Sequence, residues 1–336
     1  MNKKDAVIFA QKFMEQSQKF TVNYSSDSLI KIGPKSIRLY VAQESRIGAL
    51  ISDSFFPGFD DELAGNLEIW DSSNGIRLPD LFWAKDISEP TFEVFELQDT
   101  PFRIAVDRHQ GFIYVFDKDN QRGSIWIKEI HELYLGSFIT PFRLMISWMA
   151  NTFNSEIVHA SAIEIDGKGI LLNGASGSGK STVAIFAALS GHKILADDVV
   201  LIHANELYAI YSRCKLIKND ISPNVDHLKI HPAEDFDASK QIIKLSSFNG
   251  NFIMKTKFDA LVFPIIANMD VYKEINSMVA LRLFAPNSLA ELFGGNSQNF
   301  FKLAGYVKSH RCYRQSLSGN LGADLKILQD IAAELS

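Results

Sequence analysis

The spacing of hydrophobic and polar positions divides the chain into two differently patterned parts. Residues 4–18 have the spacing of an amphipathic helix. Its apolar face is formed by Ala6, Ile8, Phe9, Phe13 and Met14. From about 28 to 128, short apolar runs are broken by turns, and residues 36–41 alternate like a half-buried strand. Residues 111–127 predict a β-hairpin with a polar loop, so we expect a mostly β domain over residues 1–135.

A change of pattern follows this first part. Thr140 and Pro141 predict the start of a helix, with an N-cap hydroxyl and proline at the first helical position, that runs to about Asn151. We expect this helix to connect the two parts, over residues 136–154. The order strand, glycine loop, helix, strand then predicts an α/β domain over residues 155–336. The first domain carries no recognisable chemistry, and presentation of a substrate is the role we expect for it.

Two helical signals stand near the C-terminus. Residues 288–291 form a Ser-x-x-Glu capping box ahead of Leu292 and Phe293. The other signal is an apolar stripe on a last helix, formed by Leu321, Leu325, Leu328, Ala332 and Leu335. Packing against the core of the domain explains such a stripe better than contact with another subunit.

Composition narrows the classes of protein. The chain has 336 residues, of which 46% are hydrophobic and 22% charged, as in soluble globular proteins. A net charge of −5 gives no general attraction to nucleic acid or anionic membranes. The two cysteines lie 98 residues apart, which favours neither a zinc site nor a disulfide framework. The N-terminal segment does not read as a signal peptide and no apolar run is long enough for a membrane span, so a cytoplasmic location is expected.

The strongest motif is a phosphate-binding loop. Residues 170–173 read as a buried strand, and the GxxxxGK[ST] pattern of residues 174–181 follows directly, ahead of a helix. Its backbone N–H groups and the helix dipole would hold phosphate oxygens, Lys180 would reach the β- and γ-phosphates, and Ser181 would bind Mg²⁺. The alternative is a chance glycine-rich turn. The predicted nucleotide-binding residues are Gly174, Ala175, Ser176, Gly177, Ser178, Gly179, Lys180, Ser181 and Thr182.

Two adjacent carboxylates interrupt the next apolar run. Asp197 and Asp198 follow Lys180 by seventeen and eighteen residues and are flanked by apolar residues on both sides. Two like charges in such a setting need a cation or a shared proton. One of them could hold Mg²⁺ while the other accepts a proton from an attacking hydroxyl. An exposed turn with two solvated acids is the alternative.

A histidine precedes the loop strand. Residues 157–165 alternate like a strand, and Asp166 and Gly167 predict a tight turn into the strand of the loop. His159 would then lie beside the phosphate site. A histidine in a strand is more often structural than catalytic, and that alternative stays open.

The order of His159, the glycine loop and the Asp197–Asp198 pair resembles the catalytic domain of HPr kinase/phosphorylase. It resembles still more closely the HPr-kinase-like proteins of bacterial peptide-modification clusters, among them the lasso-precursor kinases. Weaker likenesses continue over residues 211–216, 260–264 and 312–317. The resemblance covers about residues 155–335 and implies an HPr kinase/PEP carboxykinase-like α/β fold that uses ATP and Mg²⁺.

The resemblance also implies roles for individual residues. Asp197 would be the general base, Asp198 would bind the metal, and His159 would lie near the transferred phosphoryl group. Arg213 would face phosphate, with a solvated surface arginine as an equal alternative. Relatives form oligomers, so a homo-oligomer is expected. The glycine-rich signature that follows the second strand in HPr kinase/phosphorylases is missing here, so neither HPr as the substrate nor phosphorolysis follows from the resemblance.

These observations predict a kinase that transfers the γ-phosphate of ATP to a serine or threonine hydroxyl of a protein or ribosomally made peptide. One alternative is a kinase for a small hydroxylated metabolite, which a closed polar acceptor pocket would favour. Another is a nucleotide-binding regulator without transfer, although such a protein needs no base. A motor-type ATPase is disfavoured, because its second acidic motif lies much further from the loop lysine than Asp197 does.

Overall fold

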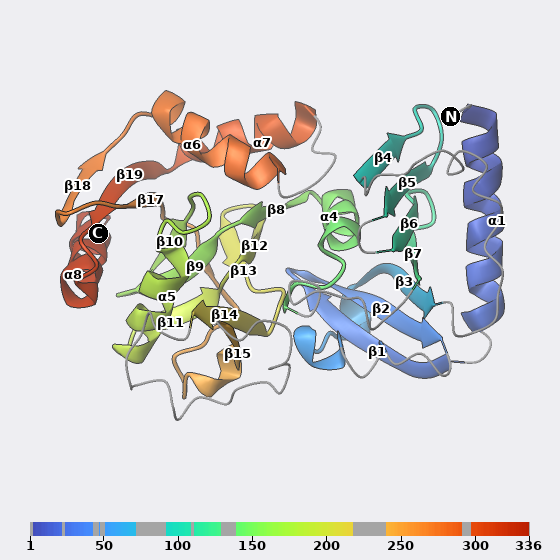
Figure 1. Cartoon of the computed structure of the whole chain (residues 1–336), viewed down its shortest axis with the longest axis horizontal. Helices are drawn as coiled ribbons and strands as arrows, with labels where there is room; N and C mark the ends of the chain where they lie inside the picture. The colour runs from blue at the N-terminus through green and yellow to red at the C-terminus, as the bar shows by residue number, and fades with distance from the viewer. Residues whose placement is uncertain are drawn as a thin grey trace. The chain divides into compact units, whose positions relative to one another are not determined.

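Helices and strands are interspersed along the described chain, which gives a mixed α/β fold with several sheets (Figure 1). The computed structural model describes residues 3–21, 24–42, 47, 51–71, 92–108, 111–128, 139–217, 240–290 and 297–335. Its internal contacts divide the chain into two compact units, Met1–Phe153 and Asn154–Ser336.

The first unit is built on a seven-stranded sheet with the order β1-β2-β3-β7-β6-β5-β4. Pairing is parallel from β2 to β3 and from β3 to β7, and antiparallel elsewhere. The predicted hairpin over residues 111–127 is confirmed as β6 and β7. The strands are β1 (Tyr24–Ile32), β2 (Lys35–Ala42), β3 (Leu63–Asp71), β4 (Phe92–Glu96), β5 (Phe102–Asp107), β6 (Phe112–Asp117) and β7 (Arg122–Ile127).

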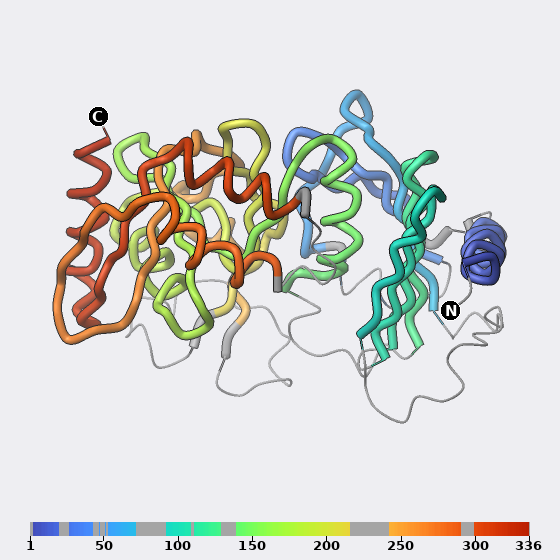
Figure 2. The backbone as a smooth tube through the Cα atoms, turned by 90° about the horizontal axis from the view of Figure 1, so that it is seen from above, coloured from blue at the N-terminus to red at the C-terminus, as the bar shows by residue number. Residues whose placement is uncertain are grey.

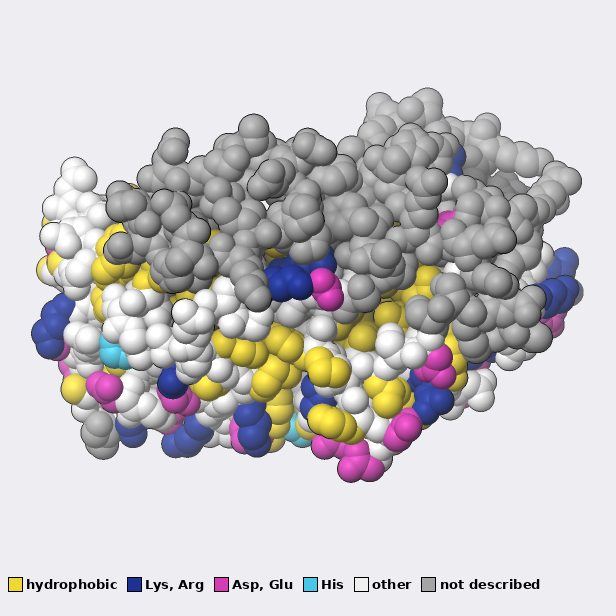
Figure 3. Space-filling view, turned by 90° about the horizontal axis from the view of Figure 1, so that it is seen from below, with side chains coloured by type: hydrophobic (Ala, Val, Ile, Leu, Met, Phe, Trp, Pro, Cys, Tyr) yellow, Lys and Arg dark blue, Asp and Glu magenta, His cyan; other side chains and the backbone are white. Residues whose placement is uncertain are grey.

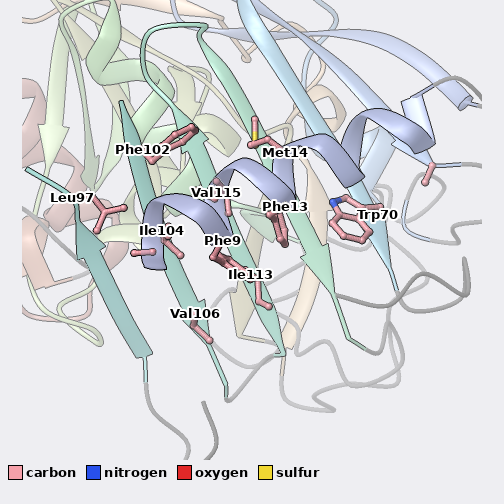
Figure 4. Packing of buried hydrophobic residues seen from close by; sticks show 13 residues of the cluster. Phe9, Phe13, Met14, Trp70, Leu97, Phe102, Ile104, Val106, Ile113 and Val115 are labelled. Atoms are coloured by element: carbon pink, nitrogen blue, oxygen red, sulfur yellow. The ribbon is translucent and has the colours of Figure 1, made fainter. Parts of the chain in front are cut away.

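Both faces of this sheet are covered by helices, because its central strands carry apolar residues on both faces. On β6, Ile113 and Val115 belong to the core cluster under α1 (Lys3–Thr21), which Figure 4 shows with Phe9 and Phe13. Successive side chains of a strand point to opposite faces. Phe116, one position on from Val115, accordingly packs on the other face against Trp148 of α4 (Arg143–Thr152). Figure 2 shows α1 and α4 on opposite sides of the strands.

Two details of these helices differ from the sequence prediction. Ile8, placed on the inner face of α1, is 39% exposed, whereas the other four predicted positions are buried. The α4 helix begins at Arg143, and its N-cap position is Phe142, which has φ 56° and no side-chain cap. Thr140 and Pro141 therefore precede the helix instead of opening it, because the chain first makes a left-handed turn at Phe142.

A buried polar network ties α1 to the sheet. Arg122 on β7 donates two hydrogen bonds to the Glu68 carboxylate on β3, at 2.6 and 2.7 Å, and a third to the Met14 carbonyl of α1. Ser17 of α1 also donates to Glu68. Trp70 and Ser124 extend the network. A carboxylate buried in this way is stable only while its cationic partner remains.

Replacing Arg122 with methionine leaves the Glu68 charge buried without its guanidinium. We expect the free energy of unfolding of the first unit to fall by about 3 kcal/mol, as is typical when one partner of a buried ion pair is removed. Urea denaturation followed by tryptophan fluorescence measures this unit selectively, because all four tryptophans fall between positions 70 and 148.

The matched control is Arg103→Met. Arg103 on β5 pairs with Glu96 of β4, whose side chain is 44% exposed. Its loss is expected to cost less than about 1 kcal/mol. Equal destabilisation by the two variants would show that burial of Glu68 is not what makes its pairing important.

In its described residues, the second unit has three sheets. The six-stranded sheet has the order β11-β9-β10-β17-β19-β18, the four-stranded sheet the order β16-β13-β12-β8, and β14 pairs with β15. The strands are β8 (Ser155–His159), β9 (Ser161–Ile165), β10 (Lys168–Leu172), β11 (Lys193–Ala196), β12 (Val199–His203), β13 (Glu206–Tyr208), β14 (Arg213–Ile217), β15 (Lys240–Lys244), β16 (Lys255–Lys257), β17 (Ala260–Ile266), β18 (Val271–Glu274) and β19 (Arg311–Leu317).

Helices pack against the six-stranded sheet of this unit. The helices α5 (Lys180–Leu189) and α8 (Leu321–Glu334) contact each other and β9, while α6 (Ser277–Ala290) and α7 (Ser297–Ser309) contact each other and β19. The apolar stripe predicted near the C-terminus lies on α8, where Leu325, Leu328 and Ala332 are buried.

The capping box predicted at Ser288 is wrong in its placement. Ser288 lies inside α6, near its end, and is fully buried. The rest of that prediction, Glu291, Leu292 and Phe293, lies outside the described residues.

Charged side chains of both signs are interspersed on the described part of the face in Figure 3, in keeping with the small net charge. Within the described ranges, no helix is both long and apolar enough to cross a membrane.

A carboxyl pair joins the first turn of α8 to the segment that precedes β18. The backbone N–H of Ser318 donates to both Asp270 and Asp324, at 3.1 Å each. Burial, together with the neighbouring Asp270 carboxylate, raises the pKa of Asp324 to about 6, whereas hydrogen bonding from Ser318 lowers the pKa of Asp270. The folded chain therefore binds a proton at Asp324 more tightly than the unfolded chain does.

We expect the contribution of Asp324 to the free energy of unfolding to fall as pH rises from about 4 to about 7. The reason is that ionisation of the Asp324 carboxyl is less favourable in the folded state than in the unfolded state. Asp324→Asn should remove this part of the pH dependence. Urea midpoints from far-ultraviolet circular dichroism at a series of pH values measure the difference. Asp330→Asn, which removes an exposed carboxylate of the same helix, is the control. An unchanged pH profile in the Asp324 variant would contradict the prediction.

Candidate functional site

The glycine loop connects β10 to α5 at one edge of the six-stranded sheet. The strands β10, β17 and β19 are parallel, so their carboxyl ends meet at this edge. Ligands of open α/β sheets bind at such an edge. Gly179, at the N-cap of α5, has φ 95°, and a Cβ atom there would lie 2.5 Å from Cδ1 of Leu317 on β19. Only glycine fits this position, because it needs both the left-handed backbone and the space.

Lys180 is folded back onto its own loop. Its Nζ donates to the carbonyl oxygens of Gly174 at 2.6 Å and Ala175 at 3.0 Å, and the residue is 6% exposed. The lysine charge is thus held at the loop, from where its flexible stem can redirect it to a phosphate. Ser181 and Thr182 follow in the first turn of α5.

Two chain crossings bring the other predicted residues to this loop. The chain passes from the four-stranded to the six-stranded sheet at Ala160, between β8 and β9, and passes back at Asp197 and Asp198, between β11 and β12. Because β8 pairs with β12 and β9 with β11, the two crossings are neighbours. The N–H of Ala160 donates to the carbonyl of Asp198 at 3.2 Å, and Ser161 Oγ donates to Asp197 Oδ1 at 2.7 Å.

The two carboxylates have different surroundings. Asp197 is 1% exposed, and burial and the Asp198 charge raise its pKa, while the Ser161 and Ser181 hydroxyls act in the opposite direction. Asp198 has φ 72°, an uncommon conformation for a residue with a side chain, and its side chain is 12% exposed. Its Oδ1 lies 3.4 Å from Nδ1 of His159 and 3.3 Å from Nζ of Lys215. The alternative of an exposed turn with two solvated acids is therefore wrong.

His159 is the last residue of β8 and pairs with Val199 of β12. Its carbonyl accepts a hydrogen bond at 2.7 Å from the side chain of Asn173, the residue that joins β10 to the glycine loop. Three positions before it, the buried Glu156 accepts from Asn299 and lies 3.3 Å from Nζ of Lys302, both on α7. Strand β8 is thus held from both sides, which fixes the histidine beside Asp198.

Arg213 opens β14 and is 1% exposed, so the alternative of a solvated surface arginine is wrong. Its neighbour Cys214 is fully buried, and burial raises the pKa of the thiol well above its ordinary value. A thiol with a raised pKa carries little thiolate and is a poor nucleophile.

Three residues at the site escaped the sequence analysis as functional candidates. Ser161 and Lys215 contact the carboxylates, and Asn173 positions the histidine strand. A polar residue that ends an apolar run directly before a phosphate loop is a signal that could have indicated Asn173. Nothing local distinguishes Lys215, because its partner Asp198 lies seventeen positions earlier in the chain.

The donor groups fit Mg²⁺. The hydroxyl of Ser181 and the carboxylates of Asp197 and Asp198 are oxygen ligands of the kind that this ion prefers. Among the residues that the structure describes, no group of three or more histidine, cysteine, aspartate or glutamate side chains could hold a metal ion. A small protein donor set matches an ion whose other ligands are water and nucleotide phosphates.

Comparison with known proteins locates the likeness at this site. Residues 151–222 match the family model of the HPr Serine kinase C-terminal domain. The HPr kinase/phosphorylase of Chlorobium phaeobacteroides is 43% identical over 61 residues, 18% of this chain and 19% of that protein. The HPr kinase/phosphorylase of Lactobacillus delbrueckii subsp. bulgaricus is 26% identical over 180 residues, 51% of this chain and 55% of that protein.

One solved structure is also similar. The Hpr(Ser) kinase/phosphatase from Coxiella burnetii is 14% identical and matches with a TM-score of 0.28, over 53% of this chain and 99% of that one. A likeness this low carries no argument. The chain aligns with about a fifth of the length of one curated relative and about half the length of the other. Within this chain, the likeness to the HPr Serine kinase C-terminal domain lies at residues 151–222, which hold the site.

Proposed function

We propose that this protein is an ATP- and Mg²⁺-dependent kinase that transfers the γ-phosphate to a serine or threonine hydroxyl of a protein or ribosomally made peptide. The observation that carries the proposal is the convergence of a phosphate loop, a buried carboxylate pair and a histidine at two neighbouring sheet crossings. The family-model match over residues 151–222 spans all three features.

The nucleotide would bind with its phosphates in the glycine loop. The loop N–H groups and the N-terminus of α5 provide partial positive charge for phosphate oxygens. Lys180, held by the carbonyls of Gly174 and Ala175, would exchange these contacts for the β- and γ-phosphates. These groups neutralise charge on the phosphates and so supply the electrostatic part of catalysis.

The contacts favour a different division of roles between the acids from the one that the resemblance implied. Asp197 is the carboxylate that interacts with Ser181, the hydroxyl expected on the metal, so we assign these two residues to Mg²⁺. The ion, when bound, neutralises the phosphate oxygens. Asp197 is also buried, which keeps it away from an incoming acceptor.

Asp198 is the better candidate for the base. It is the more exposed carboxylate of the two and lies beside His159. In the proposed step the acceptor hydroxyl gives its proton to Asp198 while its oxygen forms a bond to the γ-phosphorus. The bond from that phosphorus to the bridging oxygen breaks, and ADP leaves. His159 would hold the carboxylate in position, and the left-handed backbone at Asp198, with φ 72°, would direct the side chain to the place of transfer.

The acceptor class rests on the relatives. The two curated relatives described above are named HPr kinase/phosphorylase, and the matching family model is that of the HPr Serine kinase C-terminal domain. A protein or peptide hydroxyl is therefore the acceptor that we propose here. Presentation of that acceptor by the first unit remains a prediction.

Asp198→Asn is expected to reduce transfer about 10²- to 10⁴-fold, because the variant lacks the base, while ATP affinity changes little. Transfer is measured with γ-labelled ATP, Mg²⁺ and two acceptor sets, HPr and a pool of serine- and threonine-containing peptides encoded beside the gene. Asp166→Asn, at an exposed turn of the same unit, is the matched control and should retain full activity.

The assay separates the competing functions. Label on neither acceptor set but on a small hydroxylated metabolite would replace the protein acceptor. Tight nucleotide binding without transfer or hydrolysis would contradict a kinase and indicate a regulator. Loss of transfer in Asp197→Asn that excess Mg²⁺ restores, without such rescue in Asp198→Asn, would support the division of roles given above.

Lys180→Met should weaken ATP binding about 10- to 100-fold, the usual worth of hydrogen bonds from a charged donor. The affinity for AMP should change little, because AMP lacks the β- and γ-phosphates. Isothermal titration calorimetry measures both affinities. Lys168→Met, at the opposite end of the loop strand β10, serves as the control. Equal losses for ATP and AMP would mean that Lys180 supports the loop and does not contact those phosphates.

A further inference from the structure

A lysine outside the phosphate loop lies against the carboxylate pair. Nζ of Lys215, on β14, is 3.3 Å from Oδ1 of Asp198. The lysine side chain is 39% exposed, whereas that of Asp198 is 12% exposed. The lysine charge thus approaches the pair from the solvent side, and its electrostatic effect also reaches the buried Asp197.

Adjacent carboxylates with little exposure require a cation nearby. Their mutual repulsion is strong where water is scarce, and a neighbouring positive charge offsets it. Mg²⁺ would meet this requirement when nucleotide is bound. Nδ1 of His159 and Nζ of Lys215 both lie within 3.4 Å of Oδ1 of Asp198, and of these two groups the lysine carries a permanent positive charge at neutral pH.

The position of Lys215 allows it to withdraw. Strand β14 forms a separate two-stranded sheet with β15, and Lys215 pairs in register with Ile242. The preceding residues of the strand, Arg213 and Cys214, are buried and anchor it. The lysine itself has a flexible four-carbon stem with an exposed portion, so its ammonium can leave Asp198 without movement of the strand.

We propose that Lys215 takes the place of the magnesium charge at the Asp197–Asp198 pair in the nucleotide-free protein, and so opposes binding of the free metal ion. The metal then enters together with the nucleotide, whose phosphates bring enough negative charge to overcome the lysine. This inference rests on the proposed function only for the assignment of Asp197 to the metal.

The test is a titration of the 336-residue chain with Mn²⁺ alone, without nucleotide, in which electron paramagnetic resonance measures the concentration of free ion. Mn²⁺ accepts the same oxygen ligands as Mg²⁺. Lys215→Met should bind Mn²⁺ about tenfold more tightly than the wild type at low salt, the effect of removing one partly screened positive charge. Lys215→Arg keeps the charge and should bind Mn²⁺ as the wild type does.

Two further variants show that the gain arises at this site. Lys255→Met removes another lysine of the second unit, 3.1 Å from Glu206, and should leave Mn²⁺ affinity unchanged. Addition of Asp197→Asn to Lys215→Met should abolish the gain. If the methionine variant does not fold, Lys215→Gln supplies the same loss of charge with a polar side chain.

The outcomes separate this inference from the proposed function. The inference is overturned if Lys215→Met binds Mn²⁺ no more tightly than the wild type, or if its gain in Mn²⁺ affinity persists when Asp197→Asn is added. Neither result contradicts the proposed phosphoryl transfer. A gain confined to the charge-removing variants supports the inference even if no acceptor is phosphorylated.

Discussion

The second unit depends on one constraint, which is that two strand pairs must change sheets at adjacent positions. Ala160 and the Asp197–Asp198 pair occupy these positions, and the hydrogen bonds from Ala160 to Asp198 and from Ser161 to Asp197 connect them. The strand β11 shifts register between Ile194 and Ala196, directly before the acids. Such an irregularity bends a strand and redirects the side chains that follow. The site therefore forms because the two sheets meet there.

This geometry has an electrostatic consequence. A crossing between two packed sheets is poor in water, so both carboxylates are removed from most of the solvent that would screen them. The chain supplies positive and hydrogen-bonding groups from different elements, His159 from β8 and Lys215 from β14. A site arranged in this way would bind the proposed cation and phosphates more readily than an exposed acidic turn, because the cost of burying the charges has been met during folding.

The first unit also buries a carboxylate beside a positively charged partner, and there the pair stabilises the fold. Glu68 is buried in the centre of a seven-stranded sheet and is held by Arg122, whose guanidinium also contacts the Met14 carbonyl of α1. Consecutive apolar residues on β6 make both faces of the sheet apolar, and the ion pair fixes where α1 lies on one of these faces. Packing gives this unit its core, and the buried network makes one position of the helix more favourable than others.

The sequence by itself determined the local features: the glycine loop between a strand and a helix, the β6–β7 hairpin and the α8 stripe. Each depends on backbone requirements or periodicity within a short segment. The tertiary structure decided which distant residues meet. The contact of Lys215 with Asp198 and the burial of Arg213 follow from strand order and register, which no short window of sequence contains. For the same reason Ser288, locally a helix start, became part of a longer helix packed beside the site.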